Sequence, residues 1–334
     1  MQKTILLRII ATLLCAALML TAAGCAKPAP HLTTVRVQEV THSVFYAPMY
    51  AAMTLGYFEE EGIALELTNA GGADKAMAAL LADQADIALC GPEAAVYVYN
   101  EGREDYAVII GQLTARDGSF LISRQSEPDF TWESLANKHV LGGRKGGVPC
   151  MTLEYVLRQH GLVPGLDVNV DTSVAFNLMG GAFAGGTGDY TTLFEPTATE
   201  FVQSSQGYIV ASVGEASGEV PYTAFMVKKS RLSADDGMLT RFLRAMYKGQ
   251  TFCAEQTPDT VAQTLLPAFE GSDAAVLSAV AERYQSIDAW TTVPAMKESA
   301  YNRLLDIMET AGELSVRPPF DGLVDNAVAE AAVR

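Results

Sequence analysis

Residues 37–67 read VQEVTHSVFYAPMYAAMTLGYFEEEGIALEL, and this stretch decides the fold. Together with Val35, the valines at its start alternate with polar residues, which predicts a half-buried strand. A polar and then aromatic loop follows, a helix is predicted over residues 47–55, and residues 63–67 predict a second strand. A loop between the carboxyl end of a strand and a helix start is where open α/β sheets bind ligands. We therefore expect a ligand site beside residues 41–46.

Two short motifs in this stretch resemble a known family. Residues 45–48 read FYAP, and residues 55–63 read LGYFEEEGI. Both resemble the first motif of the substrate-binding proteins of ABC importers, in the branch that binds thiamine-pyrimidine precursors, aliphatic sulfonates, nitrate and taurine. The resemblance implies an α/β protein with the type II periplasmic-binding-protein fold. Such a fold has two lobes, each a helix-flanked mixed sheet, joined by two crossing strands.

The composition is typical of a folded protein with room for two lobes. The chain has 334 residues, of which 49% are hydrophobic and 19% are charged, so each lobe can bury its own core. Its formal net charge is -16, and it contains no basic run that could neutralise phosphates. We therefore expect no nucleic-acid partner.

Residues 1–25 predict a targeting segment. Lys3 and Arg8 give it a positive start, an apolar run follows, and the segment ends in AAGC. Small residues directly before a cysteine resemble a bacterial lipobox, so we expect a lipoprotein signal peptide and a lipid on Cys25. Residues 26–33 would then tether the protein to the extracytoplasmic face of the membrane. An ordinary signal peptide or a short membrane anchor is the alternative.

Strands and helices alternate after the tether, with strands predicted over residues 107–114, 119–123 and 190–194, which favours helix-covered sheets. We place the first crossing between lobes near residues 116–118 and the return near residues 220–225. The first lobe then comprises residues 34–117 with 223–334, and the second comprises residues 118–222.

Two further patterns complete the expected fold. Asp117 and Gly118 also fit a hairpin turn, which is the interpretation we favour for Asp117. After residue 234 the pattern is helical throughout, and these helices are expected to wrap back over the first lobe. The predicted helices are residues 236–253, 259–265, 273–286, 294–311 and 321–331.

The strongest local signal for a site is GGRKGGVPCMTLEY at residues 142–155. Gly146, Gly147 and Val148 lie between a predicted strand and a predicted helix, where backbone amides can approach an anionic or strongly polar group. Arg144 could add a planar, bidentate donor. The alternative is a tight glycine turn with a solvated Arg144.

The first lobe offers hydroxyl, aromatic and helix-start groups. Ser43, Phe45 and Tyr46 would supply a hydroxyl and an aromatic wall that suits a flat heterocycle. We expect one of the two aromatic residues, and not both, to face the cleft. The candidates at the start of the next helix are Gly91, Pro92 and Glu93.

Other candidates lie near the crossings and in the second lobe. Thr114 is close to the first crossing, together with Gln112, and Tyr222 is a weaker candidate at the return crossing. Asn177 begins a predicted helix. Glu195 lies in a Phe-Glu-Pro sequence that resembles an element of the family, although a surface carboxylate at a helix start is an equal alternative.

We expect binding without catalysis, no cofactor and no metal. Cys90, Cys150 and Cys253 are far apart, which predicts neither a disulfide framework nor a metal site. Fungal pyrimidine synthases share the fold but use pyridoxal phosphate, a histidine and a cysteine-rich iron motif, and no cysteine cluster occurs here. Of the four histidines only His42 lies in a candidate cleft, and a structural hydrogen bond is the more common role for such a residue.

These patterns predict a solute-binding lipoprotein that closes on a small polar ligand and delivers it to an ABC permease and its ATPase. We favour a thiamine-related pyrimidine or a similar heterocycle because the first-lobe loop is aromatic. A sulfonate, taurine or nitrate binder is the alternative because of Arg144 and the glycine-rich helix start. A pyrimidine-synthase-like enzyme and an extracellular sensor that contacts a receptor are the alternatives from another functional class.

Overall fold

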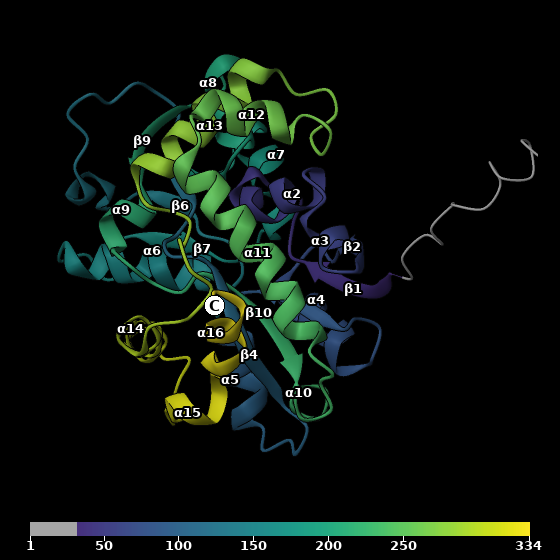
Figure 1. The fold of residues 1–334 in the computed structure, drawn as a ribbon. Coiled ribbons are helices and arrows are strands. Elements are labelled where there is room, and N and C mark those ends of the chain that lie inside the picture. Colours follow the sequence, from purple (N-terminus) through teal and green to yellow (C-terminus); the bar gives the residue numbers. More distant parts are fainter. Residues whose placement is uncertain (1–31) are drawn as a thin grey trace, which may run out of the picture. The chain divides into compact units, whose positions relative to one another are not determined.

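The computed structural model describes residues 32–334, so the predicted signal peptide, Cys25 and most of the tether lie outside the described residues. The described chain forms two five-stranded mixed sheets (Figure 1). The first has the order β2-β1-β3-β10-β4, with strands β1 (Thr33–Glu39), β2 (Ile63–Asn69), β3 (Ile87–Cys90), β4 (Ala107–Thr114) and β10 (Thr223–Lys228). The second has the order β7-β6-β8-β5-β9, with strands β5 (Ser119–Ser123), β6 (His139–Leu141), β7 (Asn169–Asp171), β8 (Tyr190–Phe194) and β9 (Tyr208–Ser212).

The first sheet follows from the alternation in β1. Val35 and Val37 are buried, and β1 pairs in parallel with β2 on one side and β3 on the other. Strand β3 is buried along its whole length because it lies between β1 and β10 and packs against α4 (Ala73–Leu81). Since β1, β2 and β3 are parallel, the loops that follow them all leave the sheet at the same edge.

Helices surround each sheet, as predicted. Those in the chain segments of the first sheet are η1 (Val44–Tyr46), α2 (Ala47–Thr54), α3 (Tyr57–Glu60), α4, α5 (Glu93–Asn100), α10 (Lys229–Ser233), α11 (Met238–Glu255), α12 (Pro258–Leu265), α13 (Ala274–Ser286), α14 (Glu298–Thr310), α15 (Phe320–Leu323) and α16 (Asn326–Ala332). Those between β5 and β10 are η2 (Trp132–Leu135), α6 (Val148–Gln159), η3 (Phe176–Leu178), α7 (Met179–Ala184), α8 (Thr197–Gln203) and α9 (Val213–Ser217).

Two neighbouring chain segments connect the sheets. The chain leaves the first sheet after β4 and returns to it in β10. The N–H of Val220 donates to the carbonyl of Ala115 at 2.8 Å, and that of Tyr222 donates to the carbonyl of Thr114 at 3.2 Å. The two predicted crossings are therefore confirmed. The hairpin interpretation of Asp117 is wrong, because β4 and β5 belong to different sheets.

The C-terminal helices differ from the prediction. The helix expected from residue 294 begins only at Glu298, because the Pro294 carbonyl accepts a hydrogen bond from the N–H of Gln112 at 2.6 Å and is held beside β4. The helix expected over residues 321–331 is divided into α15 and α16, both of which lie against β4 (Figure 1). The side chain of Asp325 starts α16 by accepting from the N–H of Ala327 at 2.9 Å.

These helices also extend beyond the first sheet. Helix α14 packs against α6, and the hydroxyl of Tyr284 on α13 donates to the carbonyl of Gly118 at 3.0 Å. The C-terminal helices cover the first sheet and its helices as expected, through contacts of α11 with α2 and of α16 with β4, and α14 contacts α6 in addition. Burial of Tyr284 among aromatic rings near the crossings explains why α13 lies there.

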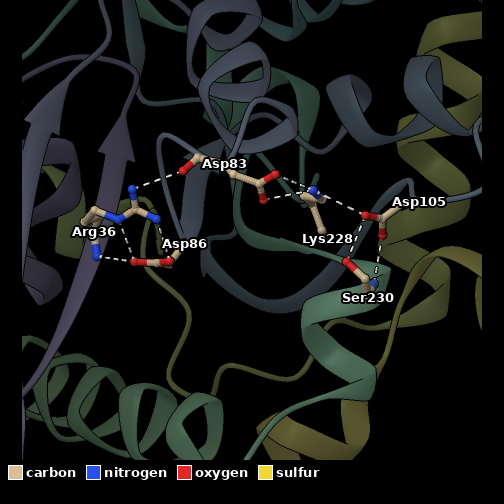
Figure 2. A network of polar contacts seen from close by, with 6 residues as sticks. All are labelled: Arg36, Asp83, Asp86, Asp105, Lys228 and Ser230. Atoms are coloured by element: carbon tan, nitrogen blue, oxygen red, sulfur yellow. Dashed lines mark hydrogen bonds and ion pairs between the residues drawn. The ribbon is translucent and has the colours of Figure 1, made fainter.

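A charge network connects strands of the first sheet away from the loops after β1 and β3 (Figure 2). Arg36 on β1 donates to both carboxylate oxygens of Asp86, at 2.9 and 3.0 Å. Lys228 on β10 lies 2.8 Å from Asp83 and 3.3 Å from Asp105. Asp83 and Asp86 precede β3, and Asp105 precedes β4. Partly exposed pairs contribute at most about 1 kcal/mol each, so this network aligns strands more than it stabilises the fold.

Candidate functional site

A cavity of about 370 Å³ lies where the loops of the two sheets meet. Its first wall comes from the segments that follow β1, β2 and β3, and its second from those that follow β6 and β7 and from the last residue of β8. Tyr222 and Thr223, at the return crossing, complete the lining. The lining residues are Val40, Thr41, Phe45, Tyr46, Gly71, Gly72, Ala73, Asp74, Lys75, Gly91, Glu93, Arg144, Gly147, Val148, Pro149, Thr172, Ser173, Val174, Ala175, Phe176, Asn177, Phe194, Tyr222 and Thr223. Because both sheets contribute, a molecule in this cavity would contact both.

Five aromatic side chains line the cavity: Phe45, Tyr46, Phe176, Phe194 and Tyr222. The ring centroid of Phe45 lies 5.4 Å from that of Phe194 and 5.7 Å from that of Tyr222. The prediction that only one of Phe45 and Tyr46 faces the cleft is wrong. Both belong to the 3₁₀ turn η1, where neighbouring side chains point about 120° apart and can flank one concave surface.

Glu93 is the charged group buried most deeply beside the cavity, with 1% of its surface exposed. Its Oε1 accepts from the N–H of Val148 at 3.4 Å, and its Oε2 has no hydrogen-bond partner among residues 32–334. Burial raises the pKa of Glu93 to about 7, although the charge of Arg144 and the N–H of Val148 act in the opposite direction. Arg144 itself is half exposed and lies 4.0 Å from Asp74, measured from Nε to Oδ1.

The structure brings eight of the predicted site residues to this cavity. They are Phe45, Tyr46, Gly91, Glu93, Arg144, Gly147, Val148 and Asn177. The weaker candidate Tyr222 lines it as well. Ligand contact by these residues remains a prediction, but their convergence follows from their positions after strands of the two sheets.

Ser43 and Glu195 do not line this cavity. The Ser43 hydroxyl donates to the carbonyl of Glu195 at 2.6 Å, so the pair connects the two walls, and both residues line a neighbouring cavity. The Glu195 carboxylate pairs with Arg283 and accepts from the N–H of Thr199 at 2.9 Å. The alternative of a surface carboxylate is wrong, because Glu195 is buried.

Pro92, Thr114 and Gly146 also lie outside the cavity lining. Thr114 is buried and hydrogen-bonds to Thr223, which takes its place on the cavity wall. The carbonyl of Gly146 accepts from the hydroxyl of Tyr97 at 2.8 Å. Gly146 has a φ of 71°, so the turn requires glycine at this position, and close approach to a ligand does not explain it.

Sequence reasoning missed two lining segments. Residues 71–75 follow β2 and residues 172–176 follow β7, so both leave their sheets beside segments that were predicted to form the site. The same argument from strand ends could have found them.

His42 and Cys150 lie in surroundings that are typical of residues with a structural role. His42 contacts the hydroxyl of Tyr50 through Nδ1 and the carbonyl of Ala268 through Nε2, each at 2.9 Å, and its ring stacks on Phe269. Burial raises the pKa of the Cys150 thiol to about 12.

No group of three or more His, Cys, Asp or Glu side chains within residues 32–334 could hold a metal ion. Within the same residues, every helix is too short or too polar to cross a membrane.

A family model described as NMT1/THI5-like matches residues 44–260, which is more than half of the chain. This chain belongs to the NMT1/THI5-like family. YtlA of Bacillus subtilis (strain 168), named as a candidate binding protein, is 40% identical to it over 313 residues. The alignment covers 94% of this chain and 93% of YtlA. The family membership confirms the resemblance of the FYAP and LGYFEEEGI motifs.

Solved structures support the fold of this family member. The alkanesulfonate-binding protein SsuA from Xanthomonas axonopodis pv. citri, bound to MOPS, superposes with a TM-score of 0.71 at 16% identity, covering 91% of this chain and 100% of SsuA. The Candida albicans protein CA3427, described as having the generic periplasmic binding protein fold, gives a TM-score of 0.67 at 15% identity, covering 88% of this chain and 97% of that one. The NMT1/THI5-like chain therefore has the periplasmic-binding-protein fold, as predicted.

Proposed function

We propose that this protein is the solute-binding component of an ABC importer, which captures a small polar heterocycle and delivers it to a permease and its ATPase without transforming it. One observation carries the proposal: a cavity whose lining comes from both sheets, beside two crossing segments that can act as a hinge. A ligand that contacts both walls favours the closed arrangement, because the open one lacks half of those contacts. The name of YtlA, a candidate binding protein, is consistent with this role.

The ligand class we propose is a thiamine-related aminopyrimidine or a similar flat heterocycle. The five aromatic side chains around the cavity offer faces and edges on which such a ring can stack. The second candidate is an alkanesulfonate or a related oxyanion, which is favoured by Arg144 on the wall and by the MOPS-bound SsuA structure. Asp74 and Glu93 line the same cavity and oppose an anion.

Isothermal titration tests the proposed function. We expect the aminopyrimidine half of thiamine to bind with a Kd of about 1 μM or below and Phe176→Ala to weaken it by about 10-fold, through loss of stacking. Tyr208→Ala, an exposed aromatic on β9 outside the cavity lining, is the matched control and should leave the Kd unchanged. Binding of taurine or ethanesulfonate with no pyrimidine binding would instead select the oxyanion function.

Membrane attachment through Cys25 is part of the proposed function. We expect the full chain to incorporate radiolabelled palmitate and to fractionate with membranes, and Cys25→Ser to lose both properties, because thioether lipidation needs the cysteine. Cys253→Ser, at a buried cysteine, is the control that should keep the label. Unchanged labelling of Cys25→Ser would show that the chain is attached in another way.

A further inference from the structure

We infer that Glu93 determines the specificity of the cavity, because its carboxylate occupies the position that an oxyanionic ligand would take at the start of α6. The cavity would therefore exclude sulfonates and select ligands that donate N–H groups. This inference rests on the proposed function, since it names the class of ligand that the binding site accepts.

The start of α6 already contacts a carboxyl group from the opposite wall. Helix α6 has twelve residues, and no side chain caps it at Gly147. The first N–H groups of a helix have no partner within the helix and attract negative charge. Here the N–H of Val148 donates to Glu93 Oε1, which comes from α5 on the first wall. The glycine-rich loop that predicts an anion site thus receives the protein's own carboxylate.

The position of this carboxylate is built into the fold. Glu93 lies in the first turn of α5, where the helix dipole favours a negative group. A Cβ atom on Gly91 would lie 2.0 Å from Glu93 Oε2, so only glycine at that position leaves space for the carboxylate. The side chain therefore folds back over its own helix start and does not extend into solvent.

The second carboxylate oxygen needs a donor. Glu93 Oε2 is buried, has no partner among residues 32–334, and belongs to a residue that lines the cavity. Leaving such an atom without a hydrogen bond is unfavourable, and an N–H group of a bound ligand would remove that cost. A sulfonate or nitrate oxygen in the same place brings an acceptor against an acceptor and, when Glu93 is ionised, a like charge.

Arg144 does not offset the unfavourable effect of Glu93 on an anionic ligand. Its guanidinium lies close to Asp74, and Lys75 is the other basic side chain on the wall. Two acidic and two basic side chains therefore face the cavity, without an excess of positive charge for an anion. An uncharged heterocycle with an exocyclic amine satisfies Glu93 and needs no counterion.

Titration of Glu93→Gln tests the inference. We expect wild-type protein to give no heat with ethanesulfonate and Glu93→Gln to bind it measurably, since glutamine keeps the size but removes the charge. The aminopyrimidine half of thiamine should bind the variant about 10- to 100-fold more weakly. The hydroxypyrimidine in which oxygen replaces the amine should bind wild type poorly and lose little in the variant.

Two further variants keep the test interpretable. Gly91→Ala should displace the carboxylate and change the ligand profile in the same direction as Glu93→Gln. Glu154→Gln, on α6 but outside the cavity lining, should behave as wild type. Thermal melting of each variant establishes that it is folded before titration.

The outcomes separate this inference from the proposed function. If the aminopyrimidine binds wild type and Glu93→Gln equally well, the inference is overturned and the proposed function stands. If no pyrimidine binds but Glu93→Gln acquires ethanesulfonate binding, the inference stands and the proposed ligand fails. Ethanesulfonate binding to wild type, or to neither protein, overturns the inference.

Discussion

Replacing Asp117 by asparagine should stabilise the folded protein by about 4 kcal/mol near pH 8 and by much less near pH 4. Asp117 lies in the first crossing segment with 0% of its surface exposed. Its Oδ1 accepts from the N–H of Ser119 at 2.7 Å, and its Oδ2 has no partner among residues 32–334. Burial raises its pKa to about 7, although the hydrogen bond from the N–H of Ser119 acts in the opposite direction.

The sign of the pH dependence follows from proton uptake. The unfolded carboxyl group ionises near pH 4, whereas the folded one ionises near pH 7. Between these values the folded state binds more protons, so wild-type stability falls as the pH rises through this window. Asparagine carries no charge at either pH and retains the acceptor for the N–H of Ser119. The stability difference between Asp117→Asn and wild type therefore grows with pH. Glu93 has a similarly raised pKa and contributes a second loss of stability as the pH rises, which Asp117→Asn does not remove.

Urea unfolding near pH 4 and near pH 8 measures this effect. The difference in unfolding free energy between Asp117→Asn and wild type should be several kcal/mol larger at the higher pH. Asp129→Asn, which removes an exposed carboxylate, is the matched control and should change stability by less than about 0.5 kcal/mol at both values. Equal stabilities of Asp117→Asn and wild type near pH 8 would contradict the account of this residue.

Replacing Gly249 by alanine should destabilise the protein by about 3 kcal/mol. Gly249 lies on the buried face of α11, where the helix packs against α2. A Cβ atom there would lie 2.1 Å from the carbonyl oxygen of Pro48 and 3.1 Å from the Cβ of Ala52, so the two helices must separate. The gain of about 1 kcal/mol in helix propensity is smaller than this cost.

Gly181→Ala provides the matched control for Gly249→Ala. Gly181 lies in α7, and an added Cβ would meet no atom within 4 Å. Its replacement should leave stability unchanged or raise it by up to about 1 kcal/mol. Denaturant unfolding compares both variants with wild type. Equal effects of the two substitutions would show that the close approach of α11 to α2 is not what requires glycine.

The exact ends of several strands could be predicted, because the residues of the strand and those beside it are enough to define them. Strands β4, β5 and β8 match the expected ranges 107–114, 119–123 and 190–194. Their ends are marked by charged, glycine or proline residues in the chain itself. The start of α14 could not be predicted in this way, because the carbonyl of Pro294 is held by Gln112, a residue far away in the sequence.

The candidate site was predictable in location but not in detail. Phe45, Glu93 and Arg144 each follow a predicted strand and could therefore be placed at the edge of a sheet. All three line the cavity. The direction of a side chain depends on partners elsewhere, as Glu195 demonstrates through its pairing with Arg283. The carboxylate at the start of α6 was not foreseen for the same reason, since Glu93 and Val148 come from opposite walls.

A crystal structure of the protein mixed with the aminopyrimidine half of thiamine tests the central claim most directly. We predict the intact ring between the aromatic side chains of the cavity, in contact with both walls, and its exocyclic amine within hydrogen-bond distance of Glu93 Oε2. A pyrimidine bound on an outer surface, in contact with one sheet alone, or chemically altered would contradict the claim that this cavity holds a solute without transforming it.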